Sequence, residues 1–458
     1  MSPAARGRVS TYNMPDTPLL EKVRRFLSER TNAWLAAALA GAFLLRLVYV
    51  LHSGNAFAYP DEADYHAIAL NILSGPLSPE SFHNREPLYP LLISLVYGAA
   101  GPHPLAVKLL QTCFSAAGMY FIYASARLLF GGRAAVIALL LAAFYPFSIF
   151  YDARLLRESL LFFWSPAIIF FSLKAAKEDG KYCCAAALFT GLAVLTKTIH
   201  LFYWPVFILA GLAYKRLSLK QAGLSTLVLF AVLSPLLLFN YAHTATAFLS
   251  RGQNFNLYQS LVLPDRVVGT DGEAAAIARD PVFAAGMKLP PGEQDKYFLK
   301  AAREEILARP GNFAHKTLWK FGKLWRPVPY RGMGYAHNWL LLALICLLTD
   351  GWLLPLGLYA GIRLFRRRRE VFPVYAYAAV FTAIYSISAS QIRYRLPLMP
   401  FFIIFSAYLL DSWLKPRKTG CCPGFSGLSS FPRARAPGIY PAGPPGGFGR
   451  KLPDGSFL

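Results

Sequence analysis

The chain is poor in charged residues. Only 16% of its 458 residues are Asp, Glu, Lys or Arg, and 55% are hydrophobic, whereas a soluble domain carries roughly 25% charged residues. Several apolar runs reach about 18–25 residues, the length that crosses a bilayer as a helix. Because lipid offers no hydrogen-bond partners to the backbone, these runs have to be helical. We therefore predict an all-α polytopic membrane protein rather than a soluble one.

Acidic residues are scarcer than basic ones. There are 24 Asp and Glu against 47 Lys and Arg, which gives a formal net charge of +23. Much of the excess lies in segments between apolar runs, and membrane proteins retain Lys and Arg on the cytoplasmic side. Topology therefore explains the charge, and no nucleic-acid partner is expected.

Cysteines are few and have no metal-binding pattern. None of the six lies in C-x-x-C spacing, so we expect small buried hydrophobic residues or free thiols. No repeat of 20–50 residues is visible. The first apolar run starts near residue 34 and is long enough to span, so no cleavable signal peptide is expected.

The basic flanks predict about ten spans, with both ends of the chain in the cytoplasm. The expected spans are 33–51, 104–129, 132–148, 157–175, 181–196, 199–214, 220–240, 338–362, 371–389 and 396–414. The apolar segment 87–101 is expected to lie along the outer surface as a juxtamembrane helix.

This topology divides the chain into three parts. Residues 1–32 form a cytoplasmic segment, residues 33–414 a transmembrane domain, and residues 415–458 a basic, Pro/Gly-rich cytoplasmic tail that we expect to be disordered. Two long outer segments, 52–103 and 241–337, are expected to cover a cavity above the helices. Helical patterns at 294–308 and 312–325 predict that the second segment is helical.

Three carboxylates follow the first span, namely Asp61, Glu62 and Asp64. If a helix starts at Asp61, then Asp61 and Asp64 share a face, and Asp61 could cap the helix. In the structural interpretation, these carboxylates are solvated acids in the first turn of a helix. The functional one is a general base with a second acid that orients it or holds a metal.

Several cations lie where cytoplasmic retention does not explain them. They are Arg85 in the first outer segment, and Lys197, Arg393 and Arg395 at the expected outer ends of spans. Arginine can grip a phosphate with two parallel hydrogen bonds. An anionic substrate would therefore account for these cations, and a snorkelling interfacial side chain is the alternative for Arg85. Arg46, inside the first span, is equally unexplained.

A second charged group lies on the next outer turn. Asp152, Arg154, Arg157 and Glu158 stand at the mouth of two spans, where charges are costly unless they are paired or functional. A structural set of salt bridges is the main alternative here. Acids and cations on one face fit a reaction with an anionic lipid-linked leaving group, whose developing charge the cations would stabilise.

The chain resembles the GT-C glycosyltransferases that use polyprenyl-phosphate sugars, and is most similar to the bacterial branch of protein O-mannosyltransferase-like and lipid A aminoarabinose transferase-like enzymes. The matching pieces are Asp61-Glu62, Arg85-Glu-Pro-Leu-Tyr-Pro90, Ala106-Val-Lys-Leu-Leu-Gln111, Ala126-Arg-Leu-Leu-Phe-Gly131, Tyr145-Pro146, Glu158, Thr196-Lys197, Gly252-Gln-Asn-Phe255, Ala308-Arg-Pro-Gly-Asn312 and Arg393-Tyr-Arg-Leu-Pro397. Their order and spacing carry the resemblance.

The resemblance implies roles for individual residues. It points to Asp61 as catalytic base, with Glu62 beside it. It also points to Asp64, Asp152 and Glu158 as supporting acids, and to Arg85, Lys197, Arg393 and Arg395 as ligands of the lipid phosphate. The chain lacks a strict D-x-D motif and the large soluble domain of some relatives. No cofactor is implied with certainty, and dependence on a divalent metal stays open.

The favoured hypothesis is an inner-membrane glycosyltransferase with its active site on the periplasmic, outer face. It would move a sugar from a polyprenyl-phosphate donor to a lipid, glycan or protein acceptor, with inversion at the anomeric carbon. Membrane lipids would be its other partners. A transporter or flippase of a lipid-linked sugar is the first alternative, and it would need no base. A non-catalytic scaffold is the second, but it does not explain the charge clusters.

Overall fold

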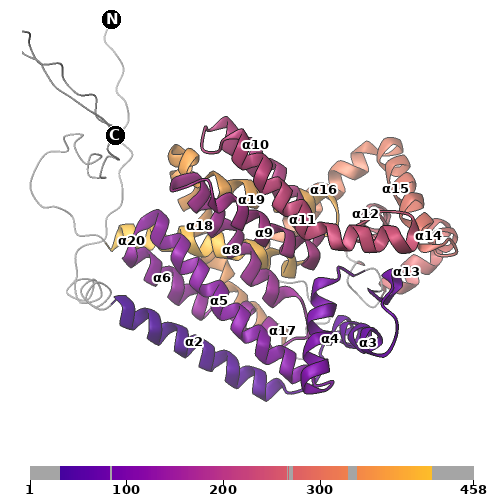
Figure 1. Cartoon of the computed structure of the whole chain (residues 1–458), viewed down its shortest axis with the longest axis horizontal. Coiled ribbons are helices and arrows are strands. Elements are labelled where there is room, and N and C mark those ends of the chain that lie inside the picture. Colours follow the sequence, from indigo (N-terminus) through magenta and orange to yellow (C-terminus); the bar gives the residue numbers. More distant parts are fainter. Residues whose placement is uncertain (1–30, 83–84, 266, 268–271, 329–337, 415–458) are drawn as a thin grey trace, which may run out of the picture. The chain divides into compact units, whose positions relative to one another are not determined.

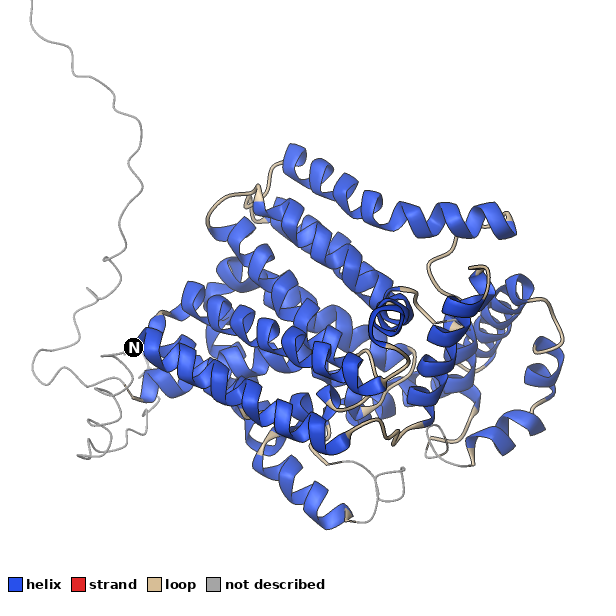
Figure 2. Cartoon of the chain, turned by 60° about the horizontal axis from the view of Figure 1, so that its bottom comes forward, coloured by secondary structure: helices blue, strands red, loops and turns tan. Residues whose placement is uncertain are grey.

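The structure is a computed structural model that describes residues 31–82, 85–265, 267, 272–328 and 338–414. Within these ranges every regular element is a helix, as Figure 2 shows. The predicted all-α fold is therefore confirmed. The N-terminal segment, apart from its last two residues, and the tail expected from the sequence lie outside the described ranges.

A bundle of apolar helices makes up most of the described chain (Figure 1). Its elements are α2 (Thr31–Ser53), α5 (Pro104–Phe130), α6 (Gly132–Ala143), α7 (Pro146–Asp152), α8 (Glu158–Lys177), α9 (Tyr182–Thr196), η2 (Thr198–Phe202), α10 (Tyr203–Ala213), α11 (Leu219–Thr244), α17 (Trp339–Leu348), α18 (Asp350–Leu364), η3 (Phe365–Arg367), α19 (Arg368–Ile387), η4 (Ile392–Leu398) and α20 (Met399–Trp413). One contiguous apolar core runs through these elements, apart from α17 and η3.

Proline and glycine set several helix ends. Pro104 and Pro146 occupy first-turn positions, where a missing N–H costs nothing. Gly131, with φ of +95°, ends α5 and starts the turn into α6. Gly118 brings α5 against α8, because a Cβ there would lie 2.6 Å from the carbonyl oxygen of Phe162. The start of α8, which carries charged site residues, is thereby fixed against α5.

Among the residues that the structure describes, six helical stretches are long and apolar enough to cross a membrane, or seven if α6 and α7, bent by 51°, form one span. The expected count of ten is not confirmed. The segments α9 and 198–213 are apolar but short, and α17 to α19 pass the test as one stretch, Trp339–Ile387. Hydropathy alone does not reveal where such helices break. The six stretches are enough to show that the protein crosses the membrane several times.

The two outer segments are helical too. The first contains α3 (Pro60–Ser74), η1 (Pro79–Phe82) and α4 (Leu88–Ala100); the second contains α12 (Gln253–Val262), α13 (Glu273–Arg279), α14 (Pro281–Gly286), α15 (Pro291–Ala308) and α16 (Pro310–Trp325). The helices predicted at 294–308 and 312–325 are therefore found, in α15 and α16. A separate small apolar cluster joins α12, α14 and α15 through Tyr258, Leu261, Phe283 and Phe298.

Candidate active site

Helix α3 begins where the acidic cluster does. Pro60 is its first residue and Tyr59 its N-cap, so Asp61 lies within the first turn and does not cap the helix. Asp61 and Asp64, three residues apart, share a face, as their spacing predicts. Both carboxylates remain about 30% exposed, at 28% and 33%.

Arg85 joins the two aspartates. Its Nη2 lies 2.9 Å from Asp61 Oδ1 and 2.7 Å from Asp64 Oδ2, and its Nε donates to the same Asp64 oxygen at 2.9 Å. The guanidinium also lies over the Tyr65 ring, 5.1 Å from its centroid. Arg85 is therefore held by three neighbours on one helix, with 27% of its side chain still exposed.

Arg393 reaches the same carboxylate from the other end of the chain. Its Nη1 donates to Asp61 Oδ2 at 2.8 Å. Each oxygen of Asp61 therefore has its own guanidinium partner. Burial alone would raise the pKa of Asp61, but Arg393 and Arg85 outweigh it and lower that pKa below its usual range. We call Asp61, Asp64, Arg85 and Arg393 the acid–arginine cluster.

Glu62 has a different environment from its neighbours. It is fully buried, and its Oε1 accepts from the backbone N–H groups of Ala58 and Tyr59 at 2.8 and 3.1 Å. Its Oε2 accepts from the N–H of Leu155 at 2.8 Å. Glu62 therefore ties the start of α3 to the turn before α8. Both of its oxygens are occupied by backbone donors, and its catalytic role beside Asp61 stays a prediction.

A second ion pair lies beside the acid–arginine cluster. Arg157 Nη1 contacts Glu86 Oε2, and the other oxygen of Glu86 accepts from the N–H and hydroxyl of Thr198 at 3.1 and 3.0 Å. Burial would raise the pKa of Glu86, but Arg157 and these donors lower it. The pair thus joins the segment after Arg85 to the turns before α8 and η2.

Lys197 and Glu158 lie deeper. The Nζ of Lys197 is 3.9 Å from the centroid of the Tyr394 ring, next to Arg393, and the side chain is only 8% exposed. Burial, reinforced by Arg157, lowers the pKa of Lys197. Glu158 is buried, and its charge acts on both Arg157 and Arg393. Both residues therefore belong to the electrostatic surroundings of the cluster.

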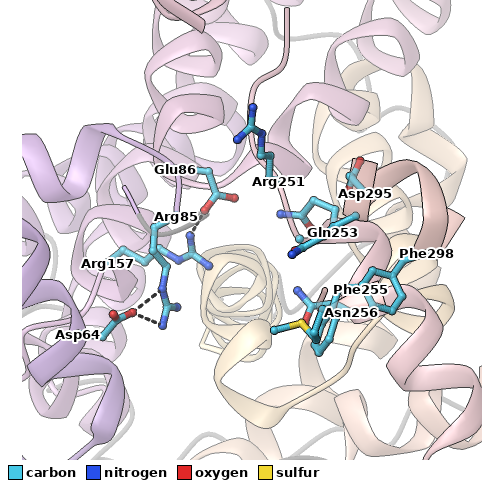
Figure 3. Close-up of a pocket in the computed structure, with 13 residues that line it drawn as sticks. Asp64, Arg85, Glu86, Arg157, Arg251, Gln253, Phe255, Asn256, Asp295 and Phe298 are labelled. Atoms are coloured by element: carbon cyan, nitrogen blue, oxygen red, sulfur yellow. Dashed lines mark hydrogen bonds and ion pairs between the residues drawn. The ribbon is translucent and has the colours of Figure 1, made fainter. Parts of the chain in front are cut away.

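A cavity of about 380 Å³ opens next to these charges (Figure 3). Asp64, Arg85, Glu86 and Arg157 line one side, and the second outer segment lines the other. The residues of that opposite wall are Arg251, Gly252, Gln253, Phe255, Asn256, Met287, Gln294, Asp295 and Phe298. Residues of both outer segments thus line one cavity, and its expected position above the membrane helices stays a prediction. Asp61 is not among the lining residues, but it is paired with Arg85, which is.

Two candidate residues lie away from this cavity. Asp152 is fully buried, 3.0 Å from Arg46 Nε, and accepts from Ser115 at 2.5 Å. This pair explains Arg46 within the first span, and the role of Asp152 as a supporting acid stays a prediction. The structural alternative was a set of salt bridges on that turn, and the observed partner of Asp152 is Arg46, from another helix.

Arg395, the other residue predicted to bind phosphate in this segment, lies inside the bundle. It is 1% exposed, contacts Asp350, and donates to the carbonyl groups of Leu324 and Arg326 at 3.1 and 2.7 Å. The segment is a 3₁₀ helix, in which residues two apart diverge by about 120°. Arg393 therefore faces Asp61 while Arg395 faces the bundle.

The opposite wall was not singled out as a site from the sequence. The piece Gly252-Gln-Asn-Phe255 carried part of the resemblance, and Gln294 starts the predicted helical pattern, so amides at these two places were the available signal. Among the described residues, no group of three or more His, Cys, Asp or Glu is arranged to hold a metal ion. Metal dependence stays open.

Comparison with known proteins gives a family match over part of the chain, and a fold. Residues 84–239 match the family model of dolichyl-phosphate-mannose-protein mannosyltransferase. No curated protein matches the chain. The fold is similar to that of the Archaeoglobus fulgidus oligosaccharyltransferase in its apo form, with a TM-score of 0.53 and 18% identity over 85% of this chain and 51% of that one. The chain therefore shares the fold of this oligosaccharyltransferase over most of its own length.

Two further structures agree with this fold. The A. fulgidus enzyme AglB, in complex with an inhibitory peptide and a dolichol-phosphate, matches with a TM-score of 0.51 and 18% identity over 84% of this chain and 51% of that one. ArnT from Cupriavidus metallidurans, bound to undecaprenyl phosphate, matches with a TM-score of 0.50 and 16% identity over 83% of this chain and 60% of that one. The chain thus spans about half to three fifths of the solved proteins it matches, and the resemblance stated from the sequence is confirmed.

Proposed function

We propose that this protein is an inverting glycosyltransferase that moves one sugar from a polyprenyl phosphate to an acceptor hydroxyl. The acceptor would be a lipid, a glycan or a protein, and the reaction would take place on the periplasmic face of the inner membrane. The observation that carries the proposal is the position of Asp61. Its two oxygens meet two arginines beside a cavity, in a GT-C fold.

Asp61 would act as the general base. It takes the proton of the acceptor hydroxyl as the oxygen attacks the anomeric carbon of the donor sugar. The bond from that carbon to the phosphate oxygen breaks, and the polyprenyl phosphate leaves with the electron pair. A single displacement inverts the configuration at the anomeric carbon. Asp64, which shares Arg85 with Asp61, would help to hold that arginine in place.

Arg85 and Arg393 would bind the donor phosphate. A carboxylate clamped by two guanidinium groups is a weak base, since a good base has a pKa near the working pH. A phosphate that draws one or both arginines away would raise the pKa of Asp61 when the donor is bound. The donor would thereby activate the base, and the same cations would stabilise the charge on the leaving group.

The remaining charged residues would position these groups. Lys197 supports Tyr394 and the segment that carries Arg393, and Glu158 balances the cations around it. Glu62 fixes the start of α3. In this proposal neither Asp152 nor Arg395 touches the substrates.

The opposite cavity wall would bind the sugar or the acceptor. Gln253, Asn256 and Gln294 offer amide donors and acceptors, and Phe255 and Phe298 offer aromatic surface. Figure 3 has the labelled amides and aromatics across the cavity from Arg85 and Arg157. Such a combination suits a hydroxylated group with apolar faces.

Two of the matched structures support a lipid-phosphate substrate. AglB was solved with a dolichol-phosphate and ArnT with undecaprenyl phosphate. A transporter of a lipid-linked sugar remains the rival, since it too needs cations. It would not need a carboxylate between them.

The test is acceptor-dependent release of polyprenyl phosphate by the purified protein in vesicles. The proposal predicts release that requires an acceptor and forms an equal amount of glycosylated product of inverted configuration. Movement of the intact donor across the vesicle membrane without release of polyprenyl phosphate would instead identify a transporter. The sugar and acceptor pools of the native cell envelope supply the candidates for this assay.

A further inference from the structure

A second, apolar groove is lined by residues of α18, α19 and α20. Its volume is about 330 Å³, and its lining is apolar or aromatic, without a charged residue. The wall includes Gly361, Ile362, Phe365, Tyr375 and Phe405. Ile362 and Phe365 are more than half exposed on the surface of the bundle, at 66% and 58%. The groove therefore opens where the bundle faces its surroundings.

One end of this groove is strongly basic. Residues 363–369 include five arginines and no acid, and four of them, Arg363, Arg366, Arg368 and Arg369, are exposed. The guanidinium of Arg368 lies 5.2 Å from the centroid of the Phe365 ring, and Phe365 lines the groove. A positive charge thus stands at the mouth of an apolar channel.

Few negative charges oppose these arginines. Glu370 is the acid next in sequence, and it pairs with Arg367 at 2.6 Å and with Lys177 at 3.6 Å. Its charge is therefore shared between two cations and does not neutralise the exposed four. A ligand that fills this groove has to combine an apolar chain with an anionic head.

We propose that this groove binds an anionic phospholipid. The acyl chain would lie along Gly361, Ile362 and Phe405, and the headgroup would contact Arg366 and Arg368. Clusters of basic residues at the end of a membrane helix attract anionic headgroups, with roughly a fivefold gain in binding for each residue. The proposal does not depend on the glycosyltransferase assignment.

A second copy of the chain fits this face less well. Gly357 and Gly361 have the small-xxx-small spacing that brings membrane helices together, but they are already used within the chain. A Cβ at Gly357 would lie 2.7 Å from Phe402, and one at Gly361 would lie 3.5 Å from Phe405. Two copies would also bring two clusters of arginines together.

The lipid tail of a glycosyl donor fits less well for a different reason. The donor phosphate belongs near Arg393, and Arg395, two residues on, contacts Asp350 at the start of α18. The exposed arginines lie beyond the other end of that 15-residue helix, about 22 Å away along its axis. One headgroup therefore does not reach both sets of arginines.

Native mass spectrometry of the full-length protein in detergent tests the proposal. Phosphatidylglycerol and phosphatidylcholine with identical chains are titrated against wild type and the double variant R366Q/R368Q. We expect wild type to bind phosphatidylglycerol at least tenfold more tightly, and the double variant to lose about 10- to 30-fold of that binding. The double variant K181Q/K220Q removes two exposed charges elsewhere and is expected to bind as wild type does.

A groove variant tests the apolar half. G361L places a larger side chain in the groove and is expected to weaken binding of both lipids. Its thermal unfolding is compared with that of wild type in the same detergent, to show that the variant is folded. Equal affinity of wild type for the two lipids, or equal losses in the two charge variants, would overturn the proposal. A dimer that G361L dissociates would assign the face to a second copy. If G361L loses binding of polyprenyl phosphate while its binding of phosphatidylglycerol stays intact, the groove would be assigned to the donor tail.

Discussion

Arg393 and Asp61 are separated by 332 residues in sequence, yet Arg393 Nη1 donates to Asp61 Oδ2 at 2.8 Å. This contact joins the segment before α20 to the first turn of α3. With Arg85 on the other oxygen, it surrounds one carboxylate with two cations. In the proposed mechanism the same cations hold the donor phosphate, so binding of the donor and readiness of the base are coupled.

Replacement of Arg393 by Ala should weaken use of the donor. A hydrogen bond to a charged group contributes roughly 1.5–3 kcal/mol, which corresponds to a loss of about 10- to 150-fold in kcat/KM for the donor. R393K should recover only part of it, because lysine binds a phosphate as a point charge. Steady-state kinetics with donor and acceptor varied separately measure the effect. A variant with wild-type donor kinetics would remove Arg393 from phosphate binding.

The pH dependence of R393A should also change. Asp61 has to be ionised to accept a proton, so activity falls as the pH drops through its pKa. In the free wild-type enzyme the two arginines lower that pKa, so the acid limb should lie below the usual aspartate value of about 3.9. Loss of Arg393 raises the pKa and should move the acid limb of kcat/KM to higher pH. An acid limb at the same pH in both proteins would contradict this coupling.

Arg395 and Asp350 should matter for stability rather than for the donor. Removal of one partner of a buried ion pair costs about 3–5 kcal/mol, so R395A and D350N should each lower the unfolding temperature strongly. The double variant should be less destabilised than the sum of the two, because no buried charge is left unpaired. Donor KM of the folded fraction should stay near wild type. A selective rise in donor KM for R395A would return Arg395 to the phosphate site.

Gln253 and Asn256 should affect binding in the cavity without affecting the base. A neutral hydrogen bond contributes about 0.5–1.5 kcal/mol, so Q253A and N256A should each raise KM for one substrate about two- to tenfold. The shape of the pH profile should stay unchanged. Kinetics with acceptors of different chemistry would tell whether this wall binds the sugar or the acceptor. No change in either KM would exclude the wall from recognition.

The sequence was sufficient for the fold class and for part of the site. Long apolar runs require membrane helices, and three-residue spacing on a helix predicts that Asp61 and Asp64 lie on one face. Hydropathy did not predict the number of spans, because it is insensitive to breaks such as the one between α6 and α7.

Long-range contacts and the directions of side chains could not be predicted in the same way. Arg393 and Arg395 look alike in sequence, and only the 3₁₀ conformation turns one toward Asp61 and the other toward Asp350. Asp152 is likewise an acid near a membrane boundary, but its partner is Arg46, from another helix. Such pairs depend on how distant helices pack, which a single sequence does not contain.

Asp61 and Asp64 offer a matched comparison for the central claim, since both lie on α3, both contact Arg85, and both are similarly exposed. Single-turnover transfer from a bound polyprenyl-phosphate sugar should be measured for D61N and D64N, together with donor binding. We predict that D61N lowers the rate about 10²- to 10⁴-fold, the usual contribution of a general base, while it still binds the donor. D64N should lose only several-fold. A folded D61N variant that transfers sugar as fast as D64N would contradict the assignment of Asp61 as the base.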